Sequence, residues 1–283
     1  MPDTAVACHA QMAAGGAVQF CAEQHFAVRP RGFYGGRATL MEPSMESTLV
    51  PRHVVITGAA GALGRAVASR FAAEGARLAL IDRKLQHLQS VFAHPEPDHG
   101  GMLLHAADVT SDAAMAPVAA AILDAFGTVD VLVHVAGGFE MGEPTHALSR
   151  ESWMRMMDLN AWSFVAVTGH FIPAMMFQRS GKVVAVSARG ALAGAAAMGA
   201  YCASKSALQR LVESLSHEVR SAGINVNSIA PSILDTQANR HAMPSANHAL
   251  WVSTGAAARA VAFLASEGAQ AIHGQHLVLD GLS

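Results

Sequence analysis

The residues His53-Val-Val-Ile-Thr57, followed directly by Gly58-Ala-Ala-Gly61-Ala-Leu-Gly64, decide the expected fold of this chain. The first run is apolar and β-branched, as in a buried strand, and Leu63 and Val67 then recur at helical spacing. A strand that enters a glycine-rich turn opening a helix places backbone N–H groups and the positive helix end around a pyrophosphate. The stretch therefore predicts a dinucleotide-binding turn, in which Gly58 permits the tight turn and Gly64 lets the helix approach the strand.

The same alternation of apolar runs and helix-length segments continues to the end of the chain. The expected strands are His53–Thr57, Leu78–Ile81, Leu103–Ala106, Val129–Val135, Lys182–Ser187, Asn225–Ala230 and His276–Leu279. Strands without polar alternation, separated by helices, indicate a parallel sheet covered on both faces. We therefore expect one doubly wound α/β domain over residues 51–283.

Residues 1–50 differ from the rest of the chain. They lack a sustained strand or helix period and contain glycine pairs and prolines typical of turns. We interpret them as a poorly ordered N-terminal extension, or as an over-long reading frame whose true start is Met41 or Met45. A regulatory arm is a further alternative.

Composition excludes several classes of protein. The chain has 19 Lys+Arg against 21 Asp+Glu, a formal net charge of -2, so no nucleic-acid or membrane-surface partner is expected. Its 3 Cys form no C-x-x-C pair, and its 15 His form no H-E-x-x-H, so no metal site is expected. No membrane span or basic signal-peptide start is convincing, which indicates a cytoplasmic protein.

Asp82 ends the second expected strand and follows Gly58 at about the spacing, roughly 20 residues, of the carboxylate that holds an adenosine ribose. A carboxylate there accepts hydrogen bonds from the ribose hydroxyls and repels a 2′-phosphate, which favours NAD(H). Arg83 leaves NADP(H) possible, because it would pair with that phosphate. A solvated, helix-capping Asp82 is the structural alternative.

Tyr201-Cys-Ala-Ser-Lys205 is the strongest local signal, in a chain with only 2 Tyr. Residues i and i+4 share one face of a helix. A phenol is poised for proton transfer where a neighbouring ammonium stabilises the phenolate. The alternative is an amphipathic helix with a Lys whose stem covers apolar surface, but the dinucleotide turn upstream favours a catalytic pair.

Together these segments resemble the classical short-chain dehydrogenase/reductase family over about residues 52–283. The matching segments are Thr57–Gly64, Asp82, Asp108-Val109, Ala136-Gly137, Asn160, Tyr201-x-x-x-Lys205 and Pro231–Thr236. The resemblance implies a Rossmann-type sheet and hydride transfer between a nicotinamide cofactor and a carbonyl or alcohol. It also implies a homotetramer or homodimer, formed through the helices around 151–178 and 201–222.

The resemblance implies roles for individual residues. Tyr201 would be the general acid/base, Lys205 would hold the nicotinamide ribose and lower the Tyr201 pKa, and Asn160 would anchor a water in a proton relay. The implied cofactor-binding residues are Gly58, Gly61, Ala62, Leu63, Gly64, Asp82, Arg83, Asp108, Val109, Ala136, Gly137, Tyr201, Lys205, Pro231, Ile233 and Thr236.

The chain departs from the family pattern at the catalytic serine, whose place is taken by Ala188. Ser187 lies one residue earlier, and adjacent strand residues face opposite sides, so it serves only if the strand end is bulged. His134 replaces an asparagine that braces the central strand. The segments around His134–Phe139 and Ala188–Leu192 are similar to the quinonoid dihydropteridine reductase branch, or equally to a side branch of carbonyl reductases.

The substrate side has few polar residues. Ala188, Met198 and Trp251 are the candidate substrate contacts, and residues 232–253 are expected to form a lid over the nicotinamide. Trp251 would stack on a flat ring or, as an equal alternative, pack the lid down. The expected function is NAD(H)-dependent oxidoreduction of a small carbonyl, hydroxyl or quinonoid substrate. The alternative is a catalytically weak or inactive NAD(H) sensor of the same fold, which Ala188 and His134 favour.

Overall fold

The computed structural model describes residues 51–92 and 102–282, so the predictions made for residues 1–50 lie outside the described residues. Seven strands form one sheet in the order β3-β2-β1-β4-β5-β6-β9, and every neighbouring pair is parallel. The strands are β1 His53–Thr57, β2 Arg77–Asp82, β3 Leu103–Ala106, β4 Val131–His134, β5 Gly181–Val186, β6 Ile224–Pro231 and β9 His276–Leu279. All seven predicted strands are present, with ends shifted by at most two residues.

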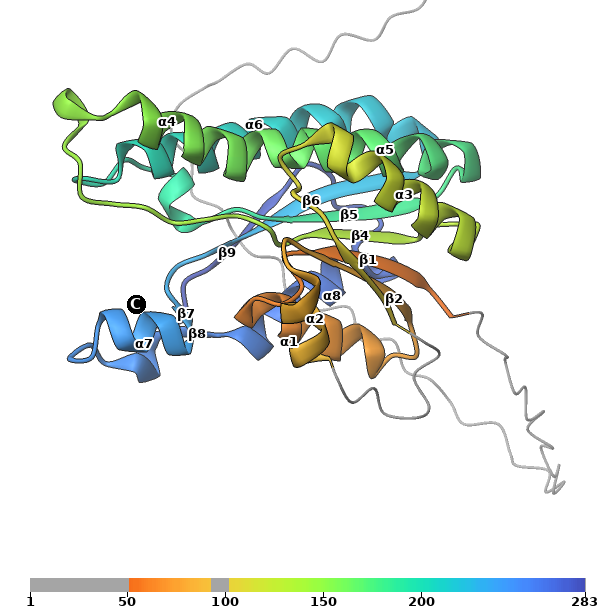
Figure 1. Cartoon of the computed structure of the whole chain (residues 1–283), viewed down its shortest axis with the longest axis horizontal. Coiled ribbons are helices and arrows are strands. Elements are labelled where there is room, and N and C mark those ends of the chain that lie inside the picture. The colour runs from red at the N-terminus through yellow and green to blue at the C-terminus, as the bar shows by residue number, and fades with distance from the viewer. Residues whose placement is uncertain (1–50, 93–101, 283) are drawn as a thin grey trace, which may run out of the picture. The chain divides into compact units, whose positions relative to one another are not determined.

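Helices cover both faces of the sheet (Figure 1). One face carries α1 Ala62–Ala72, α2 Leu85–Val91 and α8 Thr254–Leu264, and the other carries α3 Asp112–Phe126, α4 Arg150–Met157, α5 Ser163–Gln178 and α6 Gly199–Val219. Alternate residues of β1 enter opposite cores, with Val54 and Ile56 on the α1 side and Val55 on the α3 side. Burial on both faces explains why the strands are apolar without alternation.

A small second sheet was not predicted. β7 Leu234–Asp235 pairs in parallel with β8 Val252–Ser253, and α7 Gln237–Ala242 begins between them. The hydroxyl of Thr236 caps α7 by accepting a hydrogen bond from Asn239 N at 3.2 Å. Two-residue strands carry no periodic signal, so only their pairing across the chain reveals them.

No helix in the described part of the chain is long and apolar enough to cross a membrane.

Candidate active site

The predicted site residues meet at one edge of the sheet, the edge formed by the carboxyl ends of the strands. They follow or end successive strands: Gly58 after β1, Asp82 on β2, Asp108 after β3, Ala136 and Gly137 after β4, Ala188 after β5, and Pro231 on β6. The strand order reverses between β1 and β4, and ligands of open α/β sheets bind at such a switch point.

The glycine-rich turn has the geometry that phosphate binding needs. Gly58 has φ +65°, and a Cβ there would lie 2.7 Å from the backbone nitrogen of Ala136, so only glycine fits. A Cβ on Gly64 would collide with the Gly58 carbonyl. Helix α1 begins after Gly61, with no side-chain cap among the described residues and no acidic residue in its first turn. Its first N–H groups are therefore available to an anion.

Two aspartates lie beyond this turn, at the ends of β2 and β3. Asp82 Oδ2 accepts a hydrogen bond from Ala60 N at 3.0 Å, and its Oδ1 accepts from Arg83 N at 2.7 Å. Asp82 thus braces the glycine-rich turn and does not cap α2, whose capping position is Lys84. Hydrogen bonds from the Thr110 hydroxyl and backbone hold the pKa of Asp108 below its usual range.

Lys205 places its ammonium where β4, β5 and α6 meet. The side chain is 5% exposed, and Nζ donates to the carbonyl of Val186 at 2.9 Å. A Cβ on Gly137 would lie 3.0 Å from Nζ and 2.9 Å from Asn160 Oδ1. Gly137 therefore keeps the backbone of the β4 loop close to a buried cation and a buried amide.

Burial moves the pKa values of the Tyr201–Lys205 pair in opposite directions, toward the neutral form of each. Loss of solvation lowers the pKa of Lys205 to about 8. Burial raises the pKa of Tyr201 to about 12, and the neighbouring Cys202 acts in the same direction. In this structure the pKa of Tyr201 is therefore shifted in the direction opposite to the one that the family resemblance implies. The reason is that phenolate would be desolvated here, while the ammonium is hydrogen bonded to Val186.

Asn160 lies in a π-helical turn, Asp158–Trp162, between α4 and α5, and is fully buried. Its Oδ1 accepts from Gly138 N at 2.8 Å, and its Nδ2 donates to Gly138 O and to Ser204 Oγ, each at 3.0 Å. Ser204 Oγ in turn donates to the carbonyl of Tyr201 at 2.8 Å. The Asn160 side chain thus joins the β4 loop to the turn of α6 that carries Tyr201. Such π turns occur often at functional sites.

Ser187 does not take the place of the missing serine. Its backbone nitrogen donates to Ile229 O at 2.8 Å, which continues the regular ladder between β5 and β6 without a bulge. Its hydroxyl is buried and lies 3.4 Å from the carbonyl of Lys205, to which it donates. The hydroxyl therefore faces the backbone of α6, and the bulge that a catalytic role of Ser187 would require is absent from this end of β5.

His134, which stands where the family has asparagine, still braces the centre of the sheet. Its Nδ1 lies 3.0 Å from Thr57 Oγ1 and its Nε2 lies 3.1 Å from Ser163 Oγ. Because the Ser163 hydroxyl donates to Leu159 O at 2.7 Å, it accepts from Nε2–H, and Nδ1 accepts from Thr57. The chain of hydrogen bonds joins the strand before the glycine-rich turn to the π-helical turn. Burial, and then the charge of Lys205, lower the His134 pKa to about 3.

We expect His134→Asn to make the free energy of unfolding less dependent on pH in the acidic range. The native pKa of about 3 lies below the ordinary histidine value of 6.5, so between these values the unfolded state binds a proton that the native state does not bind. Unfolding free energy should fall between about pH 6.5 and pH 3, by at most about 1.4 kcal/mol per pH unit. Denaturant unfolding at pH 7 and pH 5 measures this slope. The exposed His217→Asn is the control, and equal slopes in wild type and His134→Asn would contradict the assignment.

The three candidate substrate residues lie in different settings. Ala188 follows β5 and is buried. Met198 lines a cavity of about 10 Å³ between the loops after β4 and β5, which is too small for a substrate. Trp251 is 8% exposed and packs on the ring of His248 at 4.5 Å, so it holds the 232–253 segment together. Its burial favours packing as the role of Trp251.

A larger cavity, of about 260 Å³, lies at the opposite edge of the sheet. Residues from the amino ends of the strands line it, among them His53, Asp130 and Lys182. It contains none of the predicted site residues, and ligands of open α/β sheets bind at the carboxyl edge. We therefore place the candidate site at the carboxyl edge. Across the described residues, no group of three His, Cys, Asp or Glu could hold a metal ion.

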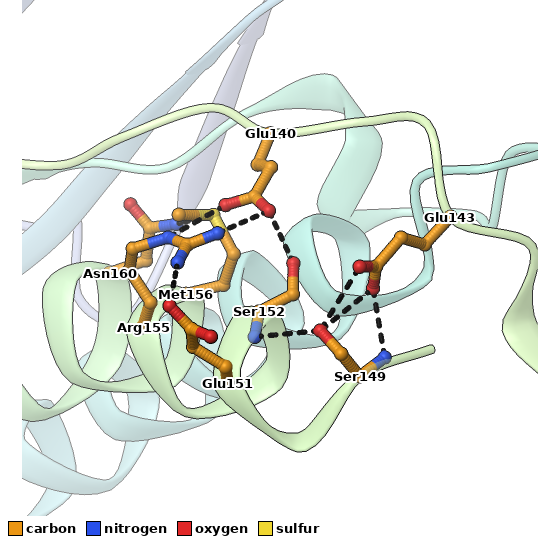
Figure 2. Close-up of polar contacts among 8 residues, drawn as sticks. All are labelled: Glu140, Glu143, Ser149, Glu151, Ser152, Arg155, Met156 and Asn160. Carbon is orange, nitrogen blue, oxygen red and sulfur yellow. Dashed lines mark hydrogen bonds and ion pairs between the residues drawn. The ribbon is translucent and has the colours of Figure 1, made fainter. Parts of the chain in front are cut away.

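The loop that follows Gly137 contributes residues to which the sequence assigned no role in the site. Phe139 contacts the ring of Tyr201 edge-on, with ring centroids 4.9 Å apart. Glu140 binds Arg155 of α4, and Glu143 binds Ser149, the capping residue of that helix, as Figure 2 shows. The stretch has no helical or strand period, and these contacts join a loop to a helix, so no pattern in the sequence indicates them.

Comparison with known proteins finds relatives both in sequence and in fold. The family model described as short chain dehydrogenase matches residues 52–247. A sorbitol dehydrogenase of Cereibacter sphaeroides is 34% identical over 64% of this chain and 70% of its own. An NADPH-dependent pterin aldehyde reductase of Arabidopsis thaliana is 32% identical over 71% of this chain and 82% of its own. The crystal structure of levodione reductase is 27% identical, with a TM-score of 0.76 over 81% of this chain and 96% of its own.

This chain therefore belongs to the short-chain dehydrogenase/reductase family. It is an NAD(P)-dependent oxidoreductase of that family.

Proposed function

We propose that the chain transfers hydride between NAD(H) and a small carbonyl, hydroxyl or quinonoid substrate, with Tyr201 and Lys205 as the proton-transfer pair. The observation that carries the proposal is the buried Lys205 ammonium, one helical turn from Tyr201 and against the backbone of Gly137. Burying a cation costs free energy, so a fold that keeps one buried indicates a role for it. Groups with perturbed pKa values cluster at functional sites.

The residues present fit a dinucleotide. The uncapped start of α1 and the Gly58 turn would bind its pyrophosphate, Asp82 would accept hydrogen bonds from the adenosine ribose, and Lys205 would hold the nicotinamide ribose. When bound, the nicotinamide supplies or accepts the hydride. In carbonyl reduction, Tyr201 Oη would give its proton to the substrate oxygen. The raised pKa of Tyr201 keeps this proton in place at neutral pH.

The alanine at position 188 favours one class of substrate over another. With no hydroxyl at this position, the substrate oxygen lacks one donor that would polarise a carbonyl. A quinonoid acceptor takes hydride readily and needs less of that polarisation. This favours a conjugated acceptor, as in the quinonoid dihydropteridine reductase branch.

We expect the cofactor preference to depend on the Asp82 charge. Asp82→Asn should lower the ratio of kcat/KM for NADH to kcat/KM for NADPH by about 10- to 100-fold, because a carboxylate repels a 2′-phosphate. Steady-state kinetics with both cofactors measure the ratio, and Asp124→Asn on the exposed side of α3 is the control. An unchanged ratio would remove Asp82 from cofactor selection.

The direct test of the function is NADH binding followed by turnover. Fluorescence titration should show saturable NADH binding, and a panel of ketones, alcohols and dihydropterins should include a substrate whose reduction consumes NADH. If the chain binds NADH and turns over nothing in such a panel, the non-catalytic sensor becomes the better description.

Self-association through α4 and α5 is part of the proposal. Large apolar side chains of these helices and of the π-helical turn between them are exposed, namely Trp153, Met154, Trp162 and Val165. A cluster of exposed large hydrophobic side chains is typical of an interface. We expect a homodimer or homotetramer, and light scattering on the purified chain gives its mass.

A further inference from the structure

The segment Gly138–Glu143, here the anchored loop, leaves β4 and is held against α4 and the π-helical turn (Figure 2). At its start, the Asn160 amide both accepts from Gly138 N and donates to Gly138 O. At its end, Glu143 accepts from Ser149 N at 2.8 Å and from the Ser149 hydroxyl at 3.0 Å. Ser149 is also the capping residue of α4, so the loop is tied to the first turn of a helix.

Glu140 provides the middle attachment of the anchored loop. Its carboxylate accepts from Ser152 Oγ and, in a two-point contact, from Arg155 Nε at 2.9 Å and Arg155 Nη2 (Figure 2). These hydrogen bonds lower the pKa of Glu140. On the other side, Gly142 N donates to Ala197 O at 2.8 Å. A two-point guanidinium–carboxylate contact fixes orientation more than it adds stability at an exposed site.

The contacts of the anchored loop leave the Phe139 side chain exposed beside Tyr201. Of its two neighbours, Gly138 binds Asn160 in the π-helical turn and Glu140 binds α4, while Phe139 stays 58% exposed. The Phe139 ring meets the Tyr201 ring edge-on, at an interplanar angle of 78°. Gly190 lies against another part of Tyr201, since a Cβ there would be 3.3 Å from Tyr201 Cε1. An exposed aromatic ring is thus fixed beside the phenol.

We propose that Phe139 is a specificity-determining residue, which forms one wall of the substrate site and selects substrates with a flat, conjugated ring next to the reacting oxygen. This inference rests on the proposed function of Tyr201. An aromatic wall offers stacking and dispersion to a flat ring and offers no hydrogen bond to the hydroxyls of a polyol. Met141, 60% exposed on the same loop, extends the apolar surface. Glu140 acts as a positioning residue, because it keeps Phe139 in place before substrate arrives.

The test compares two carbonyl probes, acetophenone and dihydroxyacetone, with NADH as hydride donor. Phe139→Ala should raise the acetophenone KM about 10- to 100-fold relative to the dihydroxyacetone KM, while Phe139→Tyr keeps the wild-type ratio. Glu140→Gln should raise the same ratio by a smaller factor and leave the NADH dissociation constant unchanged. Phe177→Ala, at a ring 93% exposed near the end of α5, is the matched control and should behave as wild type.

Binding gives a second readout that does not depend on turnover. In the presence of NAD⁺, which carries no hydride to donate, saturation-transfer NMR should show acetophenone ring protons contacting the wild type and not Phe139→Ala. An equal signal from both proteins, or an unchanged KM ratio, overturns the role of Phe139 even if carbonyls are reduced. Phe139-dependent binding without reduction of any carbonyl would instead overturn the proposed function and leave the ring-binding wall in place.

Discussion

Replacing Tyr201 with phenylalanine should lower turnover by about 10²- to 10⁴-fold, the range expected when a positioned acid or base is lost. The variant keeps the ring that contacts Phe139 and removes only the hydroxyl. Because burial raises the Tyr201 pKa to about 12, the hydroxyl is a proton donor at neutral pH, and phenylalanine has no proton to give.

Steady-state kinetics on any substrate found in the panel measure this loss. NADH affinity and the circular dichroism spectrum serve as controls, since the ring and its packing remain. A Tyr201→Phe protein with full turnover would exclude the phenol from the mechanism. Loss of turnover together with loss of NADH binding would point to a damaged site instead of a missing proton.

Lys205→Met should lower kcat/KM by about 10²- to 10³-fold, the loss expected on removing a fixed electrostatic donor, and should also raise the melting temperature. Burial lowers the Lys205 pKa to about 8 from the ordinary lysine value of 10.5, so the charged form is less favourable in the fold than in water. Methionine fills similar space without that cost. The gain should be about 2–4 °C for each kcal/mol recovered, reduced by the unpaired carbonyl of Val186.

The pH dependence of the free energy of unfolding distinguishes removal of the buried Lys205 charge from a change in packing alone. Between about pH 8 and 10.5 the native Lys205 has lost its proton and the unfolded one has not, so wild-type stability should gain from rising pH. Lys205→Met should lack that gain. Lys182→Met is the control, because Lys182 is also buried but donates to Asn225 Oδ1 at the other edge of the sheet. A Lys205→Met protein that is active, or less stable at pH 7, would contradict the prediction.

Much of the site is predictable because its determinants are local. Gly58 has φ +65° for a reason visible in the sequence, where a strand turns directly into a helix. The shared face of Tyr201 and Lys205 follows from the period of an α-helix. Asp82 lies at the carboxyl edge because it ends a strand whose apolar run is evident.

Other properties of the site arise from packing between distant segments. Surrounding groups decide the direction of the Ser187 hydroxyl and the hydrogen bonds of His134. They also decide the pKa values of Tyr201 and Lys205. The spacing of residues in the sequence predicts which side of a helix or strand a side chain lies on. It does not predict how well that side is solvated in the folded protein. For this reason the phenol pKa is raised where the family resemblance implied a lowered one.

The chain's own pattern of glycines and apolar runs was enough to specify a doubly wound sheet, its seven strands and the edge where a dinucleotide would bind. Local backbone preferences and the periodicity of apolar residues determine these features, and both can be read from consecutive residues. The placement of Phe139 beside Tyr201 through Glu140 and Arg155 required the folded chain. Contacts between a loop and a helix obey no sequence period, because they depend on where the two segments meet in space.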